Sequence, residues 1–169
     1  MFYKFLSLII PLIISNTIHM VMVKKNAFSF LKAPISENAF GANKTWRGFI
    51  ALSLLNGLFT MMFLWALGKH SLQGNFLFGA LLGFVYMLFE LPNSYIKRRL
   101  GIGAGNSSSK YKWLFAFMDK SDSAIGVCLV FFFWASISIF QLFYLILISI
   151  ALHALVSMVL VQLKIKKSF

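Results

Sequence analysis

Long apolar stretches separated by short polar segments dominate the pattern of this chain. A membrane-spanning helix needs roughly 17–25 mostly apolar residues, and several stretches reach that length. The last of them, residues 123–163, is long enough for two spans, and its least apolar point lies near residues 138–141. The pattern therefore predicts an all-α integral membrane protein with short cytoplasmic loops and five transmembrane helices, at about residues 5–23, 48–67, 74–91, 122–139 and 142–163.

The composition fits a bilayer rather than water. Hydrophobic residues make up 60% of the chain and charged residues 12%, whereas soluble domains are typically about half apolar and about a quarter charged. We therefore expect burial in lipid to be the main organising force. We predict one membrane domain, residues 1–169, with no separate soluble domain.

Charge is distributed unevenly between the two ends of the predicted spans. The chain has 16 Lys and Arg residues but only 4 Asp and Glu residues. With five spans, every basic residue except Lys4 and Lys69 lies on one side of the membrane, and the acids lie there too. The positive-inside rule then predicts a protein of the cell (inner) membrane, with its N-terminus outside and its C-terminus in the cytoplasm. Because the cations gather at the ends of apolar stretches, they suit anionic headgroups and phosphates, and we predict no nucleic-acid partner.

Two of the four acids, Asp119 and Asp122, stand three positions apart at the edge of the last apolar stretch. On a helix both carboxylates would share one face. One interpretation is a helix N-terminus, where the helix dipole favours acids in the first turn. The other is a Mg²⁺ site, because this ion typically takes one or two carboxylates together with substrate phosphates. The spacing alone leaves both interpretations open.

A second cluster, residues 41–48 (GANKTWRG), precedes the second predicted span. Lys44 and Arg47 lie at the expected start of a helix, which Asn43 or Thr45 could cap. A helix start offers unpaired N–H groups and a partial positive charge, so two cations there make a favourable phosphate site. The alternative is an interfacial anchor, in which the tryptophan of this segment sits at headgroup level beside the two cations.

A third cluster follows the third predicted span, which ends around Glu90. A carboxylate at membrane depth is costly unless it is paired or bound to a metal, and such groups are often functional. Lys97, Arg98 and Arg99 follow, and they could bind a triphosphate because arginine makes bidentate contacts to phosphate. The alternative is a cationic anchor at the end of the span, with Glu90 in a salt bridge.

Polar residues inside the predicted spans are interpreted as interhelical hydrogen-bond partners rather than catalysts. These residues are Asn16, His19, Asn56 and His153. Residues 107–109 predict a flexible loop tip. The sequence contains no HExxH, CxxC, GxSxG or Walker A pattern, so it does not support the chemistries that those motifs carry.

Together the three clusters resemble a known family. The segments GANKTWRG at 41–48, SYIKRRLG at 94–101 and DKSD at 119–122 are similar to motifs of CDP-archaeol synthase, within the wider group of membrane CTP:phosphatidate cytidylyltransferases. The five-span layout and the length are also similar, so the resemblance covers most of the chain. It implies a reaction in which a lipid phosphate attacks the α-phosphorus of CTP and pyrophosphate leaves.

The resemblance also implies roles for individual residues and partners. Asp119 and Asp122 would ligate Mg²⁺, and Glu90 would be a second metal or network ligand. The catalytic residues that it implies are Asp119, Asp122, Lys97 and Glu90. The residues that it places at or near the CTP phosphates are Asn43, Lys44, Thr45, Arg47, Lys97, Arg98 and Arg99. The implied partners are CTP, a membrane lipid phosphate and the bilayer, and the small size of the chain is compatible with a homodimer.

Two other classes of function compete with an enzyme. A small transporter would need polar residues along a path through the whole bilayer, whereas here they concentrate on one side. A non-catalytic protein that binds anionic headgroups would use the basic residues alone, and it would not need Asp119 and Asp122. The resemblance and the paired acids favour the enzyme.

Overall fold

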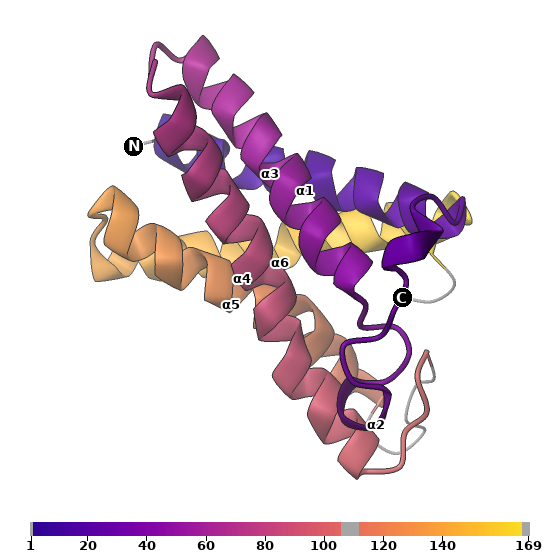
Figure 1. The fold of residues 1–169 in the computed structure, drawn as a ribbon. Helices are drawn as coiled ribbons and strands as arrows, with labels where there is room; N and C mark the ends of the chain where they lie inside the picture. The colour runs from indigo at the N-terminus through magenta and orange to yellow at the C-terminus, as the bar shows by residue number, and fades with distance from the viewer. Residues whose placement is uncertain (1, 106–111, 167–169) are drawn as a thin grey trace.

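The computed structural model describes residues 2–105 and 112–166. This part of the chain is built from helices joined by short connections (Figure 1). The predicted loop tip at residues 107–109 lies outside the described residues. The helices are, in chain order, α1 (Phe2–Lys24), the 3-10 helix η1 (Ser29–Leu31), α2 (Glu37–Phe40), α3 (Trp46–Ala66), α4 (Leu72–Arg99), α5 (Lys112–Ala135) and α6 (Ile139–Gln162).

Four helices of the described part, α1, α3, α4 and α6, are long and apolar enough to cross a membrane. The predicted class, an all-α membrane protein, is confirmed. The predicted count of five transmembrane helices is too high by this measure. The fifth long helix, α5, is not among the four, since Asp119, Lys120 and Asp122 place three charges within one helical turn.

Helix α4 continues well beyond the predicted end of the third span. The sequence predicted a span that stops before Pro92, but the helix runs to Arg99. Proline removes one backbone hydrogen bond from a helix interior, and in the same turn the Ser94 hydroxyl donates to the Glu90 carbonyl at 2.9 Å. As a consequence Lys97 is helical and shares one face of α4 with Glu90.

The last apolar stretch is divided earlier than predicted. Helix α5 ends at Ala135, and Ser136 then takes a positive φ of 48°. A capping box begins α6: the Ser138 hydroxyl accepts from the Gln141 backbone N–H at 3.3 Å, and the Gln141 side chain accepts from the Ser138 backbone N–H at 3.0 Å. Helix α5 also begins earlier than the predicted fourth span, at Lys112.

Helices α3 and α4 form a closely packed antiparallel pair (Figure 1). A Cβ atom added at Gly79 would lie 2.6 Å from the Asn56 carbonyl oxygen, and one at Gly83 would lie 2.6 Å from the Leu52 carbonyl oxygen. Small residues four apart let transmembrane helices approach each other in this way. The approach brings Asn56 Nδ2 to the Gly79 carbonyl at 2.7 Å, which confirms the predicted interhelical role of Asn56.

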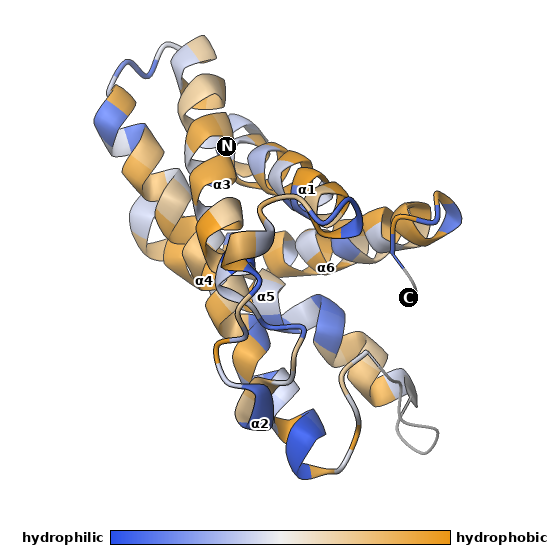
Figure 2. Cartoon of the chain, turned by 45° about the vertical axis from the view of Figure 1, so that its right-hand side comes forward, coloured by the Kyte–Doolittle hydropathy of each residue, from blue (hydrophilic) through white to orange (hydrophobic). Residues whose placement is uncertain are grey.

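Different segments of the chain meet at the two ends of the bundle. At one end Lys4 Nζ donates to the Ala135 carbonyl at 2.9 Å, so the start of α1 lies beside the end of α5. At the other end α2 lies beside the last turns of α4, where the rings of Phe40 and Tyr95 are 6.5 Å apart. Figure 2 shows hydrophobic residues along the helix bodies, and hydrophilic ones around α2, along the adjoining parts of α4 and α5, and at the connection between α3 and α4.

Candidate active site

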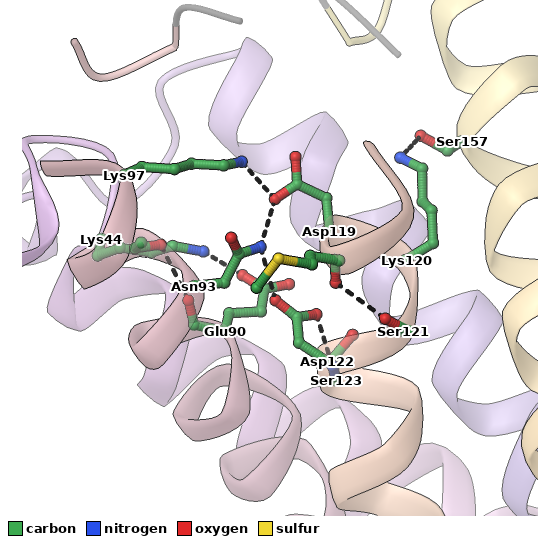
Figure 3. A network of polar contacts seen from close by, with 12 residues as sticks. Lys44, Glu90, Asn93, Lys97, Asp119, Lys120, Ser121, Asp122, Ser123 and Ser157 are labelled. Carbon is green, nitrogen blue, oxygen red and sulfur yellow. Dashed lines mark hydrogen bonds and ion pairs between the residues drawn. The ribbon is translucent and has the colours of Figure 1, made fainter. Parts of the chain in front are cut away.

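The candidate active site lies between α4 and α5, near the end of the bundle that carries α2. Helix α4 contributes Glu90, Asn93 and Lys97, whose spacing of three and four positions places them on one helix face. Helix α5 contributes Asp119 and Asp122, which share a face for the same reason. Figure 3 shows these five side chains gathered between the two helices.

Asn93 joins the two aspartates. Its Nδ2 atom donates to Asp119 Oδ1 at 2.6 Å and to Asp122 Oδ2 at 3.1 Å. Asn93 is only 3% exposed, and its Oδ1 atom is buried with no hydrogen-bond partner among the described residues. Carboxylates repel each other at close range unless a positive group lies between them. The two acids therefore accept from the partly positive hydrogens of one amide group, in a position that also suits a cation.

Two lysines neutralise the outer acids of this cluster. Lys97 Nζ lies 2.5 Å from Asp119 Oδ1, and Lys44, from the segment before α3, forms an ion pair with Glu90. The side chains of Lys44, Glu90 and Lys97 are each 20% exposed or less, whereas that of Asp119 is 42% exposed. The cluster is therefore partly desolvated, with Asp119 as its open side.

The helix-dipole interpretation of the two aspartates is wrong. Helix α5 begins at Lys112, so Asp119 lies in about the third turn, and the dipole effect fades within the first. Asp122 has specific partners instead, because its Oδ1 atom accepts from the Ser123 backbone N–H at 2.6 Å while Asn93 holds its Oδ2 atom. Particular donors, rather than a helix end, hold both carboxylates.

Of the residues that the sequence predicts at the CTP phosphates, Lys44 and Lys97 enter the cluster between α4 and α5. Thr45 is buried at the N-cap position of α3, but its side chain makes no capping hydrogen bond. Arg47 is 4% exposed and donates from Nη1 to a backbone carbonyl of the segment after α1 at 3.0 Å. Asn43 is exposed in the loop before α3.

The two arginines at the end of α4 lie in different surroundings. Arg98 packs against Gly41, where an added Cβ atom would lie 3.0 Å from Arg98 Nη1. Its Nε atom is buried without a hydrogen-bond partner in the described part of the chain. Arg99 is exposed: its Nε atom donates to the Tyr95 hydroxyl at 2.8 Å, and its guanidinium lies 5.2 Å from the ring centroid. Arg98 thus borders the 41–48 segment, whereas Arg99 turns outwards.

Asn93 is the residue of this cluster that the sequence predictions did not include. Glu90, Asn93 and Lys97 follow the spacing i, i+3, i+7, which is typical of one face of a helix. This signal was present in the sequence. This spacing was missed because the span was predicted to stop before Pro92, and a spacing of three and four residues indicates a shared face only within a helix.

The fold and the site define a membrane protein of apolar helices whose charged cluster lies near the polar end of the bundle. Over residues 1–169 the chain matches the CarS-like family, described as CDP-archaeol synthase. The chain belongs to this family, which confirms the resemblance seen in its three clusters and indicates an enzyme of lipid synthesis. No curated protein and no solved structure matches the chain.

Proposed function

We propose that this protein is a CTP-dependent cytidylyltransferase of phospholipid biosynthesis. Its substrate would be a membrane lipid phosphate of the archaetidic or phosphatidic acid type, and its products a CDP-activated lipid and pyrophosphate. The proposal depends above all on one observation, the convergence of Asp119 and Asp122 on Asn93, with Lys97 and Lys44 beside them. Membership of the CDP-archaeol synthase family supports the same reaction.

The proposed reaction is a displacement at phosphorus. An oxygen of the lipid phosphate forms a new bond to the α-phosphorus of CTP. The bond from that phosphorus to the oxygen bridging the α- and β-phosphates breaks, and its electron pair leaves with pyrophosphate. Such transfers need little covalent chemistry from the protein, which mainly positions the reactants and stabilises their charge.

The residues of the cluster fit a Mg²⁺ ion. This ion typically takes one or two protein carboxylates and completes its shell with water and substrate phosphates. Asp119 and Asp122 supply two carboxylates, and the Asn93 Oδ1 atom, which has no hydrogen-bond partner among the described residues, is a further oxygen beside them. Among the described residues, no group of three or more His, Cys, Asp and Glu side chains could hold a metal ion. Phosphate oxygens of the substrates would therefore complete the coordination shell of the ion. When bound, Mg²⁺ would offset the negative charge of the reacting phosphates.

The two lysines are proposed to bind phosphate oxygens. Lys97 Nζ borders Asp119, the exposed member of the cluster, so a phosphate that approaches this open side would meet the ammonium group. Lys44 is held on the Glu90 side of the cluster. We assign Glu90 as a positioning residue, because its ion pair fixes Lys44 against α4. Arg98 is proposed to extend the site, since its buried Nε atom lacks a partner among the described residues.

The site is proposed to face the cytoplasm. The charged cluster lies near the end of the bundle where the polar segment around α2 meets α4 (Figure 2). The positive-inside rule assigns the more basic end of a membrane protein to the cytoplasm. CTP would reach the polar end from water, while the lipid phosphate would approach from the bilayer.

Incubation of the detergent-solubilised protein with radiolabelled CTP, Mg²⁺ and a panel of ether and ester lipid phosphates tests the proposal. We expect a labelled CDP-lipid and one pyrophosphate for each lipid converted. If no member of the panel gives a CDP-lipid while the protein remains folded, the proposed function is wrong.

A further inference from the structure

The connection between α1 and α3 carries two exposed phenylalanines. Phe28 is 56% exposed and Phe30 is 77% exposed, and their rings pack edge to face with centroids 6.2 Å apart. Phe28 also has a positive φ of 52°, which is unfavourable for a bulky residue. Exposed aromatic rings are unfavourable in water, whereas short segments that lie in a membrane interface commonly bury such rings among lipids. The pair is therefore suited to contact with lipid.

The same connection begins and ends at the membrane boundary. The span of α1 ends at Lys24 after 22 residues, and the span of α3 starts at Trp46. At a rise of 1.5 Å per residue the first span is about 33 Å long, slightly more than the hydrocarbon thickness of about 30 Å. Arg47 Nη1 donates to the Ala27 carbonyl at 3.0 Å, so the end of α1 lies beside the start of α3. The two phenylalanines, four and six positions after Lys24, are thus close to the lipid headgroups.

Three lysines flank the aromatic pair. Lys24 and Lys25 precede it, Lys32 follows it, and all three are exposed. The ion pairs found among the described residues involve none of these lysines. Clusters of lysine next to a membrane span attract anionic lipids, and segments that lie in the interface combine lysines with phenylalanine. A negatively charged lipid surface therefore matches both the rings and the cations.

The connection is also fixed to the backbone of Lys44. The Ile35 backbone N–H donates to the Lys44 carbonyl at 2.9 Å, and the Trp46 backbone N–H donates to the Ala33 carbonyl at 3.1 Å. These two bonds form an antiparallel bridge. The Lys44 side chain forms the ion pair with Glu90 in the candidate site. A shift of the connection relative to the bilayer would thus be transmitted to Lys44.

We propose that residues 24–32 form a membrane anchor, in which Phe28 and Phe30 insert among lipids and the three lysines bind anionic headgroups. The anchor also positions Lys44 through the backbone bridge. This second part rests on the proposed function, because Lys44 is assigned there to a phosphate of CTP, whereas insertion does not depend on it. The competing occupant is another protein surface. Lipid is favoured because the anchor directly follows one span, is bonded to another and carries cations on both sides of its rings.

Spin labelling locates the anchor relative to the bilayer. A nitroxide is attached to Phe30→Cys and, as a control, to Asn38→Cys, which is exposed on α2. Cys128 is the single cysteine of the chain and is 1% exposed, so the unsubstituted protein provides the background. In liposomes of phosphatidylcholine and phosphatidylglycerol, we expect the label at position 30 to be accessible to oxygen and protected from a water-soluble nickel complex. The label at position 38 should show the reverse.

Two outcomes of this experiment would overturn the anchor. Equal accessibility of the two labels to the nickel complex would place position 30 in water. Protection of position 30 from both oxygen and the nickel complex would indicate a protein contact in place of lipid.

The charge of the lipid tests the role of the lysines. Phosphatidylglycerol is a phosphodiester and therefore not a substrate of the proposed reaction, and its replacement by phosphatidylcholine should weaken insertion at position 30. Lys32→Gln should lower the ratio of inserted to free label by about fivefold. Lys69→Gln is the control, because Lys69 is exposed in the connection between α3 and α4. Equal ratios in the two variants, or insertion that does not depend on phosphatidylglycerol, would overturn the binding of anionic headgroups.

Kinetics test the link between the anchor and Lys44. Phe30→Ser is compared with Phe140→Ser, because Phe140 is 76% exposed and lies in the first turn of α6. We expect Phe30→Ser to raise KM for CTP by about threefold or more, because Lys44 loses its fixed position, and Phe140→Ser to leave it unchanged. Equal KM values for CTP would overturn the link. If the wild-type protein forms no CDP-lipid, the proposed function and this link both fail, while the spin labels still decide whether the anchor inserts.

Discussion

Asn93 Nδ2 of α4 lies 2.6 Å from Asp119 Oδ1 of α5, across the contact between the two helices. The same nitrogen lies 3.1 Å from Asp122 Oδ2, so one amide holds both carboxylates. The acids are two of only 4 in the chain. Because both aspartates of α5 contact Asn93 of α4, the candidate site is shared by two helices.

Removal of the Asn93 amide should impair both folding and activity. Asn93→Ala loses two hydrogen bonds to charged groups and leaves two carboxylates without the group between them. We expect about 1–3 kcal/mol of lost stability in detergent and a fall in kcat of about tenfold or more. Thermal unfolding and CDP-lipid formation measure the two effects.

Asn75→Ala is the matched control for this variant. Asn75 is also buried on α4, but it donates to the Lys69 carbonyl at the opposite end of the helix. The Asn75→Ala variant should lose stability but keep the wild-type kcat per folded molecule. If Asn93→Ala affects kcat no more than Asn75→Ala does, the amide has no role in the site.

Neutralisation of one aspartate should separate catalysis from folding. Asp122→Asn keeps the shape of the side chain but removes one negative charge from the proposed Mg²⁺ site. We expect CDP-lipid formation to fall by about 10²-fold, with a higher Mg²⁺ concentration needed for half-maximal rate. Treatment of the wild-type protein with EDTA should abolish activity, and added Mg²⁺ should restore it.

Glu37→Gln is the control for the loss of a single negative charge. Glu37 is exposed in the first turn of α2 and is the one acid of the chain outside the site and its network. It should behave as the wild-type protein does. Full activity of Asp122→Asn would contradict the metal role of Asp122.

The ion pair of Lys44 and Glu90 should show coupling in a double-mutant cycle. Each single change, Lys44→Met or Glu90→Gln, leaves a half-buried charge without its partner, and the double change removes both charges. We therefore expect the double variant to be less destabilised than the sum of the two single variants, by about 0.5–3 kcal/mol. Denaturant unfolding in detergent provides the free energies.

The kinetic constants of the same variants distinguish the role of Lys44 from that of Glu90. If Lys44 binds phosphate and Glu90 only positions it, the double variant should recover stability but not its KM for CTP. A double variant with wild-type KM for CTP would restrict Lys44 to a structural role.

The packing of α3 against α4 should depend on Gly83. In Gly83→Ala the new Cβ atom would lie 2.6 Å from the Leu52 carbonyl oxygen, and a backbone atom cannot move aside cheaply. We expect a loss of about 1–3 kcal/mol in stability, measured by thermal unfolding. Gly74→Ala is the control, since its Cβ atom would meet only the Ser71 side chain. Equal stability of the two variants would show that the helices can separate without cost.

The sequence predicted the positions of the helices correctly where the evidence lay in neighbouring residues. Apolar runs of spanning length predicted all five long helices within a few residues at most ends, because the length of a run is read directly from the chain. The two large boundary errors have one cause, the treatment of polar residues as the end of a helix. Asn93 to Arg99 continue α4 because polar residues can be helical where a helix extends beyond the apolar part of the bundle. The apolar residues 113–118 belong to α5 as well, although Asp119, Lys120 and Asp122 separate them from the predicted span.

The sequence by itself determined the membrane class, the family and the three charged clusters, because hydropathy, charge and motif spacing are properties of neighbouring residues. Only the tertiary structure decided which members of those clusters meet. It brought Lys44 to Glu90 and Lys97 to Asp119, placed Asn93 between the aspartates and turned Arg99 outwards. Those choices depend on how far each helix is rotated and where it crosses its neighbour, and the packing of distant residues such as Gly83 against Leu52 sets both.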